Sequence, residues 1–312
     1  MKNSNAPLVS IGLPVFNGEK SLRQTLDSLL AQDCCDFELI ISDNASTDKT
    51  EEICVEYAAR DSRIRYVRQI NNLGSINNFN FVLQAARGEY FMWAAADDFW
   101  ATDFIHTLLA GLENNPTAVG VFCPYQLVDE DTDVVLEGIW RCNYESRYII
   151  IRLLKFTWYY CDANIYGLLR REHLDDIKFK HWAWINASTP YNLTFPIIYL
   201  LLTKGNFLTI GEKPLWFKSI TTSHWHPTPF KTNPLLSYIA HIIRKINLLL
   251  RSLHYIYLGT KSAPLILIIF PFLLLRFLFD CITPIYAAIS IWASGRKISQ
   301  VSPQEVWRLG VR

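Results

Sequence analysis

The chain has 312 residues, half of them hydrophobic, and a formal net charge of only +1. That length exceeds one typical domain, and the composition supports a large core. The seven cysteines form no C-x-x-C pair or ligand cluster, which argues against a zinc site or a disulfide framework and indicates free thiols in a reducing cytosol. The segment before the first predicted strand, residues 1–7, is short and polar, so no signal peptide is expected.

Charge divides the chain into two parts. Residues 1–212 hold 27 acids and 18 Lys or Arg, whereas residues 213–312 hold 2 acids and 12 Lys or Arg. We therefore expect one domain over 1–212 and a basic, apolar membrane-association region over 213–312. A basic tail can also bind nucleic acid, but this one is too apolar and too thinly charged for that partner. The anionic cytoplasmic face of a membrane is the expected partner.

Strands and helices are predicted to alternate over the first hundred residues. Hydrophobic runs predict strands over 8–15, 37–42 and 64–67, with a further strand that ends at Asp97. Helical spacing predicts helices over 22–30, over a segment carrying Ile53 and Tyr57, and over 78–86. This β-α-β-α-β-α-β order is typical of an α/β fold with a mostly parallel sheet and helices on both faces.

Polar residues follow three of these strands. Asn17, Asp43 and the pair Asp97–Asp98 all stand where a strand ends. The carboxyl ends of parallel strands meet at one edge of the sheet, which is where ligands bind in such folds. Two adjacent carboxylates suit Mg²⁺ or Mn²⁺ shared with substrate phosphates. Alternatively, Asp97 caps the next helix and Asp43 forms an Asx-turn.

Four sequence blocks resemble the family 2 glycosyltransferases, which have the GT-A fold. Residues 9–17 (V-S-I-G-L-P-V-F-N) resemble the opening strand of the family, and residues 40–48 (I-I-S-D-N-A-S-T-D) resemble its I-I-V-D-D-G-S-T-D turn. Residues 72–90 resemble its N-x-G…N…A-x-G-E-Y block. Residues 93–98 (W-A-A-A-D-D) resemble a variant of its D-x-D-D pattern that lacks the first acid. The resemblance is clear for about a third of the chain and fades after Gly120.

The resemblance implies roles for individual residues. It implies that Asp43 accepts a hydrogen bond from the base, typically uracil, and that Asp98, with Asp97, holds the divalent cation. The cation would stabilise the charge on the diphosphate leaving group. The remaining residues implied to bind the nucleotide are Pro14, Phe16, Asn17, Asn44, Asn72, Asn78 and Asp97.

The general base is not evident from the sequence. The family usually places a carboxylate 80 to 100 residues after the metal site, but residues 181–194 contain no acid. Residues 166–171 resemble the G-x-x-R segment of the family, and Asp162 precedes it, which makes Asp162 the candidate catalytic base. Asp175 and Asp176 are expected on a surface turn. Two alternatives stay open: an enzyme with a displaced base, or a degenerate protein that binds a nucleotide or a partner without catalysis.

The tail has several apolar segments. Residues 239–253 predict an amphipathic helix that lies on a membrane surface or packs on the catalytic domain. Residues 262–275 and 281–295 are uncharged, and Arg276 and Asp280 separate them. Three prolines, Pro264, Pro271 and Pro284, are expected to break this region. It could lie in the interface, re-enter the membrane, or span it with Arg276 paired to Asp280; association without a span is favoured.

These patterns together predict a membrane-associated, metal-dependent, inverting glycosyltransferase. Its donor would be a nucleotide sugar, with UDP expected, and its acceptor a lipid-linked or other saccharide in surface polysaccharide assembly. A nucleotidyltransferase would also carry metal-binding acids on an α/β fold. Residues 17–20 (N-G-E-K) lack the glycine-rich phosphate loop of that class. Fold alone does not fix the substrate.

Overall fold

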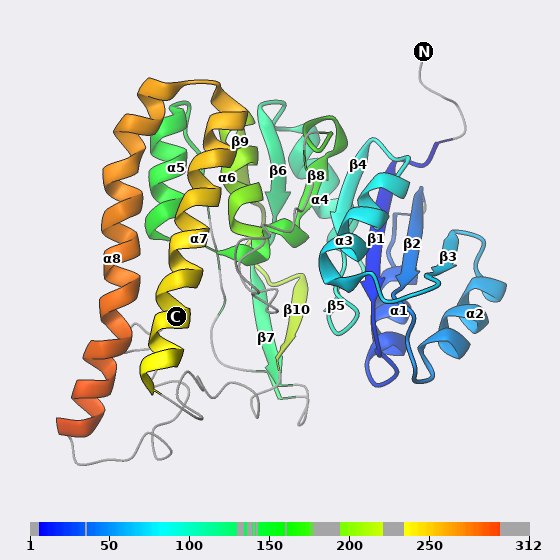
Figure 1. The fold of residues 1–312 in the computed structure, drawn as a ribbon. Coiled ribbons are helices and arrows are strands. Elements are labelled where there is room, and N and C mark those ends of the chain that lie inside the picture. Colours follow the sequence, from blue (N-terminus) through cyan, green and yellow to red (C-terminus); the bar gives the residue numbers. More distant parts are fainter. Residues whose placement is uncertain are drawn as a thin grey trace.

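The computed structural model describes residues 6–34, 36–129, 134–135, 139, 141, 143–159, 161–175, 177, 194–220 and 234–293. A seven-stranded sheet runs through the centre of this part of the chain in the order β3-β2-β1-β4-β8-β6-β9 (Figure 1). Its strands are β1 (Val9–Val15), β2 (Phe37–Asp43), β3 (Ile64–Arg68), β4 (Tyr90–Trp93), β6 (Ala118–Phe122), β8 (Leu168–Arg170) and β9 (Asn206–Thr209).

The first four strands of this sheet are parallel, as the sequence predicts. In the ladder, Val15 pairs with Asp43, Asp43 with Arg68, and Gly12 with Trp93. β8 is antiparallel to both β4 and β6, so the sheet is mixed beyond β4. The predicted α/β class is therefore confirmed. One boundary differs: the strand expected to run to Asp97 ends at Trp93, and a loop carries the chain to the acids.

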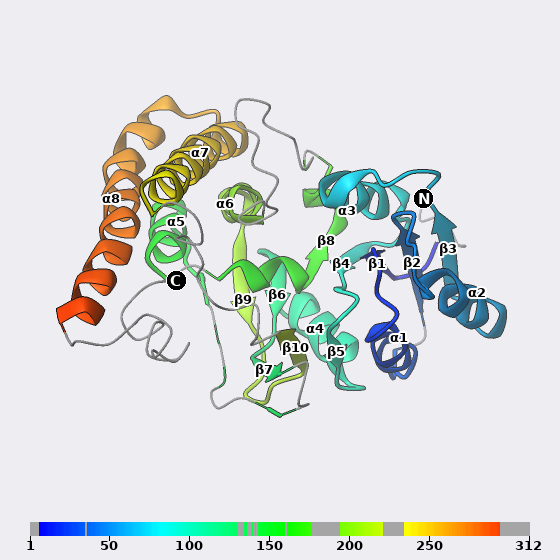
Figure 2. The same cartoon turned by 60° about the horizontal axis from the view of Figure 1, so that its bottom comes forward.

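Helices cover both faces of the sheet (Figure 2). α3 (Gly74–Ala85) and α6 (Thr194–Lys204) lie on one face, and α1 (Leu22–Leu30) and α4 (Phe104–Glu113) lie on the other. α2 (Thr50–Arg60) follows β2. The buried strands β1, β2 and β4 are apolar on both sides because helices cover both faces of their sheet.

A second, three-stranded sheet stands beside the first. β10 (Trp216–Ile220) lies between β5 (Phe99–Trp100) and β7 (Tyr125–Asp129), antiparallel to β5 and parallel to β7. Its rings pack closely: Phe99 and Phe217 stack with centroids 4.9 Å apart. β10 follows the expected domain boundary at 212, yet it pairs with strands of the catalytic part. We therefore place the start of the helical C-terminal region at α7.

The C-terminal region is a pair of long helices. α7 (Pro234–Thr260) and α8 (Ala263–Ala293) pack against each other, and α8 also packs on α5 (Ile149–Trp158) (Figure 1). The expectation that prolines break this region is wrong, since α8 continues through Pro271 and Pro284. Pro264 lies in the first turn of α8, where its missing N–H has no helical partner in any case. Packing along α7 and α5 offsets the cost of the hydrogen bond lost at Pro271.

Candidate functional site

The carboxyl ends of β1, β2 and β4 meet at one edge of the main sheet, as the parallel register requires. Hydrogen bonds join the segments that leave these strands. The Asn44 N–H donates to the Val15 carbonyl (2.9 Å), and the Ser21 hydroxyl donates to the Ala96 carbonyl (3.0 Å). The segment after β4, which carries Asp97, is therefore attached to the start of α1. We treat this edge as the candidate active site.

Asn17 shapes the turn after β1. Its backbone adopts φ +53°, a left-handed conformation that asparagine tolerates better than most residues. The Asn17 N–H donates to the Ser46 hydroxyl (2.9 Å), and its side-chain oxygen accepts the Thr47 N–H (2.9 Å). Asn17 therefore fastens the β1 turn to the β2 turn. Its neighbour Phe16 is 49 % exposed and Pro14 is half-buried, so both are near enough to the surface to contact a ligand.

Asp43 is fully buried at the end of β2. One carboxylate oxygen accepts the Ser46 N–H (2.9 Å), and the other accepts the Tyr66 hydroxyl (3.1 Å) and lies 3.6 Å from Arg68 Nε. The Asx-turn considered as an alternative would bond the N–H two residues on, whereas Asp43 bonds the N–H of Ser46, three residues on; Asp43 nevertheless holds its own turn. The contact with a nucleotide base expected from the sequence stays a prediction, since both carboxylate oxygens have protein partners in this structure. Ala45, next in this turn, holds φ +60° at the position where the family pattern has glycine.

The asparagines expected at the nucleotide connect strand ends to one another. The Asn44 side chain donates to the Asn72 side-chain oxygen (2.9 Å) and accepts the Leu73 N–H (2.7 Å). Asn78 is buried and bonds both the carbonyl and the hydroxyl of Ser42. Asn44 and Asn78 therefore position the β2 and β3 ends. Asn72 is the exposed member of this group and remains available to a ligand.

Asp98 lies inside the protein. It is 1 % exposed, and its two carboxylate oxygens accept the Trp216 indole N–H (3.0 Å) and the Ser219 N–H (2.9 Å). Burial, with the nearby Asp97 charge, raises the pKa of Asp98 to about 7, although Lys218 and these hydrogen bonds act in the opposite direction. This geometry does not suit the metal-binding role expected of Asp98. It makes Asp98 the link between the loop after β4 and β10.

Asp97 is the exposed acid of the pair. It stands in the loop after β4, seven residues before α4 begins at Phe104, and so does not cap that helix. Of the two acids expected to bind the metal, we therefore keep Asp97 alone as the proposed contact. Within the described ranges, no group of three or more His, Cys, Asp or Glu side chains could enclose an ion. One exposed carboxylate still suits Mg²⁺ or Mn²⁺, which commonly complete their ligand set with water and substrate phosphates.

The direction of β8 places the acids before it and the acids after it at opposite edges of the sheet. Because β8 is antiparallel to β4, the segment before it lies at the edge where β4 ends, and the segment after it lies at the opposite edge. Asp162 begins the short helix η1 (Asp162–Tyr166) before β8, so its backbone stands at the same edge as the candidate site; its side chain lies outside the described part. Asp175 follows β8 and lines a polar pocket with Glu89 at the opposite edge. Asp176 and residues 181–193 lie outside the described residues.

The contribution of β10 to this edge was not expected from the sequence. Trp216 packs against Tyr166 of η1 with ring centroids 5.5 Å apart, and the Lys218 ammonium lies 5.4 Å from the centroids of both rings. β10 therefore brings a cation and an aromatic cluster beside the two aspartates. The aromatic and β-branched residues of W-F-K-S-I favour a strand. Because the charge changes sharply after residue 212, the boundary predicted from the sequence assigned this whole segment to the C-terminal region.

Comparison with known proteins identifies the family. The family model described as glycosyl transferase family 2 matches residues 10–178, which is more than half of the chain. The chain belongs to this family. The family assignment based on the four sequence blocks is thereby confirmed, and it extends beyond Gly120, where the visible resemblance fades.

Individual relatives match part of this family 2 glycosyltransferase. An uncharacterized glycosyltransferase of Rickettsia typhi is 35 % identical over 132 residues, which cover 41 % of this chain and 40 % of that protein. The glycosyltransferase GlyG of Streptococcus pneumoniae is 31 % identical over 140 residues, covering 45 % of this chain and 40 % of GlyG. The matches thus span about two fifths of these relatives.

Solved structures confirm the GT-A fold. Staphylococcus aureus TarS, in complex with UDP, aligns with a TM-score of 0.54 at 15 % identity over 82 % of this chain and 72 % of the TarS chain. The mannosyltransferase PcManGT of Pyrobaculum calidifontis, in complex with GDP-Man and Mn²⁺, aligns with a TM-score of 0.53 at 18 % identity, covering 97 % and 84 %. Identities this low show the fold alone.

Replacing each aspartate of the pair by asparagine should separate their roles. Asp97→Asn should leave the free energy of unfolding within about 0.5 kcal/mol of the wild type, since surface changes are usually that small. Asp98→Asn should lower it by about 1–3 kcal/mol, because an amide cannot accept both buried hydrogen bonds. Urea unfolding measures both values, and Mn²⁺ binding in the presence of UDP should be lost only in Asp97→Asn. Loss of stability in Asp97→Asn, with none in Asp98→Asn, would reverse the assignment.

The raised pKa of Asp98 predicts a pH effect of defined sign. Its ordinary pKa is 3.8 and its pKa in the folded protein is about 7, so the folded state binds the proton more tightly than the unfolded chain does. The stabilisation from this proton is complete below pH 4 and disappears as the pH rises through 7. The difference in unfolding free energy between wild type and Asp98→Asn should therefore shrink by more than about 1 kcal/mol from pH 5 to pH 8. A difference that grows with pH would contradict this environment for Asp98.

Proposed function

We propose that this chain transfers a sugar from a nucleotide-sugar donor to a saccharide acceptor, with inversion at the anomeric carbon. The observation that carries the proposal is the exposed Asp97, placed at the edge where the turns after β1, β2 and β3 meet. Family membership supports the reaction class, and the ligands named for TarS and PcManGT support a nucleotide-sugar donor. UDP is the expected nucleotide.

The proposed donor site has a base end and a diphosphate end. The base end comprises the β1 and β2 turns, with Phe16 exposed beside them and Asp43 beneath. The diphosphate end comprises Asp97, through which the chain would hold Mg²⁺ or Mn²⁺. When bound, this cation acts as a Lewis acid that stabilises charge on the departing diphosphate. Lys218, held close to Asp98, adds positive charge to the same end of the site.

An inverting transfer needs a carboxylate that takes the proton from the attacking hydroxyl. Asp162 remains the candidate for this role, because η1 begins with it at the same sheet edge as Asp97. Asp175 is unsuitable, since it stands at the opposite edge. A non-catalytic nucleotide-binding protein would bind the donor at this edge without turning it over, so turnover separates the two functions.

A donor screen tests the proposed reaction. Purified full-length protein with Mn²⁺ should release nucleoside diphosphate from one sugar nucleotide of a panel, faster when the correct acceptor is present. Asp97→Asn should reduce this rate on the order of 100-fold, equivalent to ~2.7 kcal/mol of lost transition-state stabilisation. Asp175→Asn is the matched control and should keep at least half of the rate. Tight donor binding without release of diphosphate would favour the non-catalytic alternative.

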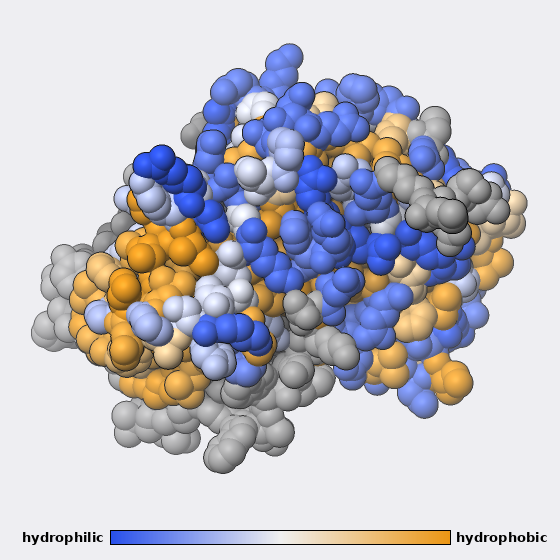
Figure 3. Space-filling view, turned by 90° about the horizontal axis from the view of Figure 1, so that it is seen from above, coloured by the Kyte–Doolittle hydropathy of each residue, from blue (hydrophilic) through white to orange (hydrophobic). Residues whose placement is uncertain are grey.

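We further propose that α8 holds the protein against a membrane. Residues 263–282 are long and apolar enough to cross one, and only 17 % of this stretch is buried in the protein. Its exposed apolar side chains include Leu267 (74 %), Leu275, Leu278 and Ile282. Figure 3 shows such side chains gathered on the α8 side of the molecule, seen as orange at the left. Because α8 packs along α7 and α5, we favour a helix that lies in the interface over one that spans the bilayer.

The charge of α7 and α8 also supports a position of these helices against a membrane. α7 and α8 contain one acid, Asp280, against the four cations Arg244, Lys245, Arg251 and Arg276. Such an excess is attracted to anionic lipids of a cytoplasmic leaflet. A catalytic domain held at that surface would meet acceptors carried on lipids, so we propose a lipid-linked saccharide acceptor in surface polysaccharide assembly.

Changing the exposed face of α8 tests the membrane proposal. The combined changes Leu267→Gln, Leu275→Gln, Leu278→Gln and Ile282→Gln should abolish most co-flotation with vesicles that contain phosphatidylglycerol. The matched control is Ile70→Gln, because Ile70 is 95 % exposed but belongs to the catalytic domain; it should float like the wild type. Alkaline carbonate should release the wild-type protein from membranes. A requirement for detergent would indicate a span, and flotation of the α8 variant would refute the docking face.

A further inference from the structure

The C-terminal hairpin of α7 and α8 forms an outer layer over α5 and α6. α7 packs against α6, α8 packs against α5, and the two helices of each layer contact each other. One side of the hairpin therefore rests on protein. Which side chains stand on its other side depends on how each helix is rotated about its own axis, and contacts with the inner layer fix both rotations.

Gly259 fixes the side of α7 that faces α6. A Cβ at this position would overlap the hydroxyl of Thr203 on α6, so the two helices approach each other closely here. Ser252, Tyr255 and Ile256 share the face of Gly259, because they precede it by three, four and seven residues. All three are buried. This face of α7 is thus its contact with the protein.

The opposite face of α7 carries a row of exposed apolar side chains. Ile246, Leu250 and Tyr257 are 41–53 % exposed, and their spacing of four and seven residues is that of one helix face. At 3.6 residues per turn they lie about 180–220° around the helix from Gly259. This α7 row therefore points away from α6. The predicted amphipathic helix packs on the catalytic domain with one face and leaves the other face uncovered.

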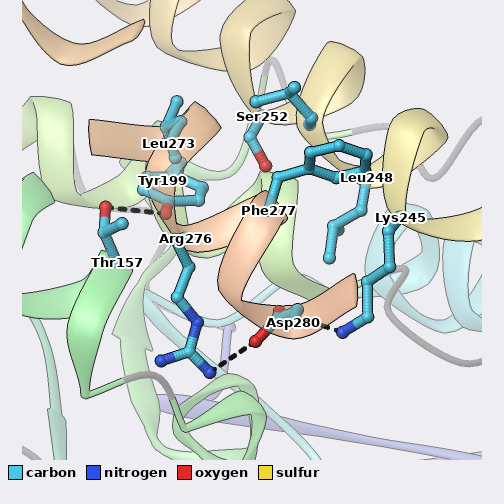
Figure 4. Close-up of a pocket in the computed structure, with 10 residues that line it drawn as sticks. Thr157, Tyr199, Lys245, Leu248, Ser252, Leu273, Arg276, Phe277 and Asp280 are labelled. Carbon is cyan, nitrogen blue, oxygen red and sulfur yellow. Dashed lines mark hydrogen bonds and ion pairs between the residues drawn. The ribbon is translucent and has the colours of Figure 1, made fainter. Parts of the chain in front are cut away.

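Ion pairs and a hydrogen bond fix the rotation of α8 in the same way. Asp280 lies 3.0 Å from the Lys245 ammonium of α7 and 2.9 Å from Arg276 (Figure 4), and Arg276 donates to a backbone carbonyl of α5. This side of α8 thus faces α5 and α7. Leu267 and Leu278 are exposed and lie about 180–220° around the helix from Arg276 and Asp280. This α8 row therefore points away from the inner layer.

The two rows form one apolar surface, because α7 and α8 pack side by side. A second copy of this chain is a poor partner for that surface. The two helices carry four cations and one acid, so self-association would bring like charges together. An anionic membrane offsets this positive charge and also accepts apolar side chains. Tyr257 suits the headgroup level of such a membrane, where tyrosine is common.

We propose that the α7–α8 hairpin lies flat on an anionic membrane, with the α7 row and the α8 row in contact with lipid together. The inference rests on the proposed membrane association, to which it adds a second helix and an orientation. α5 and α6 lie on the side of the hairpin that faces away from the lipid. α8 then runs along the membrane surface and does not cross the bilayer.

Glutamine substitutions in the α7 row test its share of the contact. The double variant Leu250→Gln, Tyr257→Gln should lower co-flotation of the full-length protein with phosphatidylglycerol vesicles at least threefold. The matched control is the double variant Val55→Gln, Ile70→Gln, because both side chains are exposed and apolar but belong to the catalytic domain. The control should float like the wild type. Wild-type flotation of the α7 variant would refute its contact with lipid.

A photo-crosslinker on each row detects lipid without removing the contact. Leu250→p-benzoylphenylalanine and Leu278→p-benzoylphenylalanine should crosslink to phosphatidylglycerol with yields within threefold of each other. Both yields should exceed that of Val55→p-benzoylphenylalanine at least tenfold.

The crosslinking pattern separates this inference from the association on which it rests. Lipid crosslinks at Leu278 without any at Leu250 would show that α8 docks alone, so the flat hairpin falls and the membrane association stands. Absence of lipid crosslinks at both positions, with no flotation of the wild type, would refute the membrane association as well. A crosslink from Leu250 to a second copy of the chain would overturn the assignment of this surface to lipid.

Discussion

The buried carboxylate of Asp98 is the interaction on which the candidate site depends. Its two oxygens receive hydrogen bonds from Trp216 and Ser219, which lie 118 and 121 residues later in the chain. The backbone carbonyl of Asp98 also accepts the Thr25 hydroxyl of α1. One residue therefore joins α1, the loop after β4 and β10. Because Asp97 is its neighbour, the position of the exposed acid follows from how Asp98 is held.

This arrangement explains why the smaller sheet belongs to the catalytic unit. β10 carries Trp216 under the loop and Lys218 toward Tyr166 of η1, the segment that begins with the candidate base. The sheet thus brings together the loop after β4, the segment before β8 and the strand after residue 212. A displacement of β10 would therefore move Asp97, Lys218 and η1 together. The partly protonated state of Asp98 near neutral pH makes this link sensitive to pH.

Sequence alone predicted the parts of the site that depend on local pattern. Strand, turn and helix signals placed Asn17 and Asp43 at the ends of β1 and β2, which the parallel register brings to one edge. Asp97 was expected at a strand end as well, but it stands in the loop after β4, which ends at Trp93. The inward or outward direction of two adjacent aspartates depends on partners more than a hundred residues away, so the pattern could not assign Asp98 to the interior. β10 was missed for a related reason: its residues favour a strand, but its membership of the catalytic part follows only from its pairing with β5 and β7. α8 continues through its prolines because it packs against α5 and α7, and sequence rules that consider neighbouring residues alone do not include such packing.

The central claim is that Asp97, and not Asp98, binds the metal ion that contacts the donor diphosphate, at the edge formed by β1, β2 and β4. A crystal structure of the full-length protein with UDP and Mn²⁺ tests it most directly. The account predicts Mn²⁺ within about 2.3 Å of an Asp97 carboxylate oxygen and in contact with both phosphates, while Asp98 keeps its bonds to Trp216 and Ser219. Mn²⁺ on Asp98 with those bonds broken, or a diphosphate bound away from this edge, would contradict it.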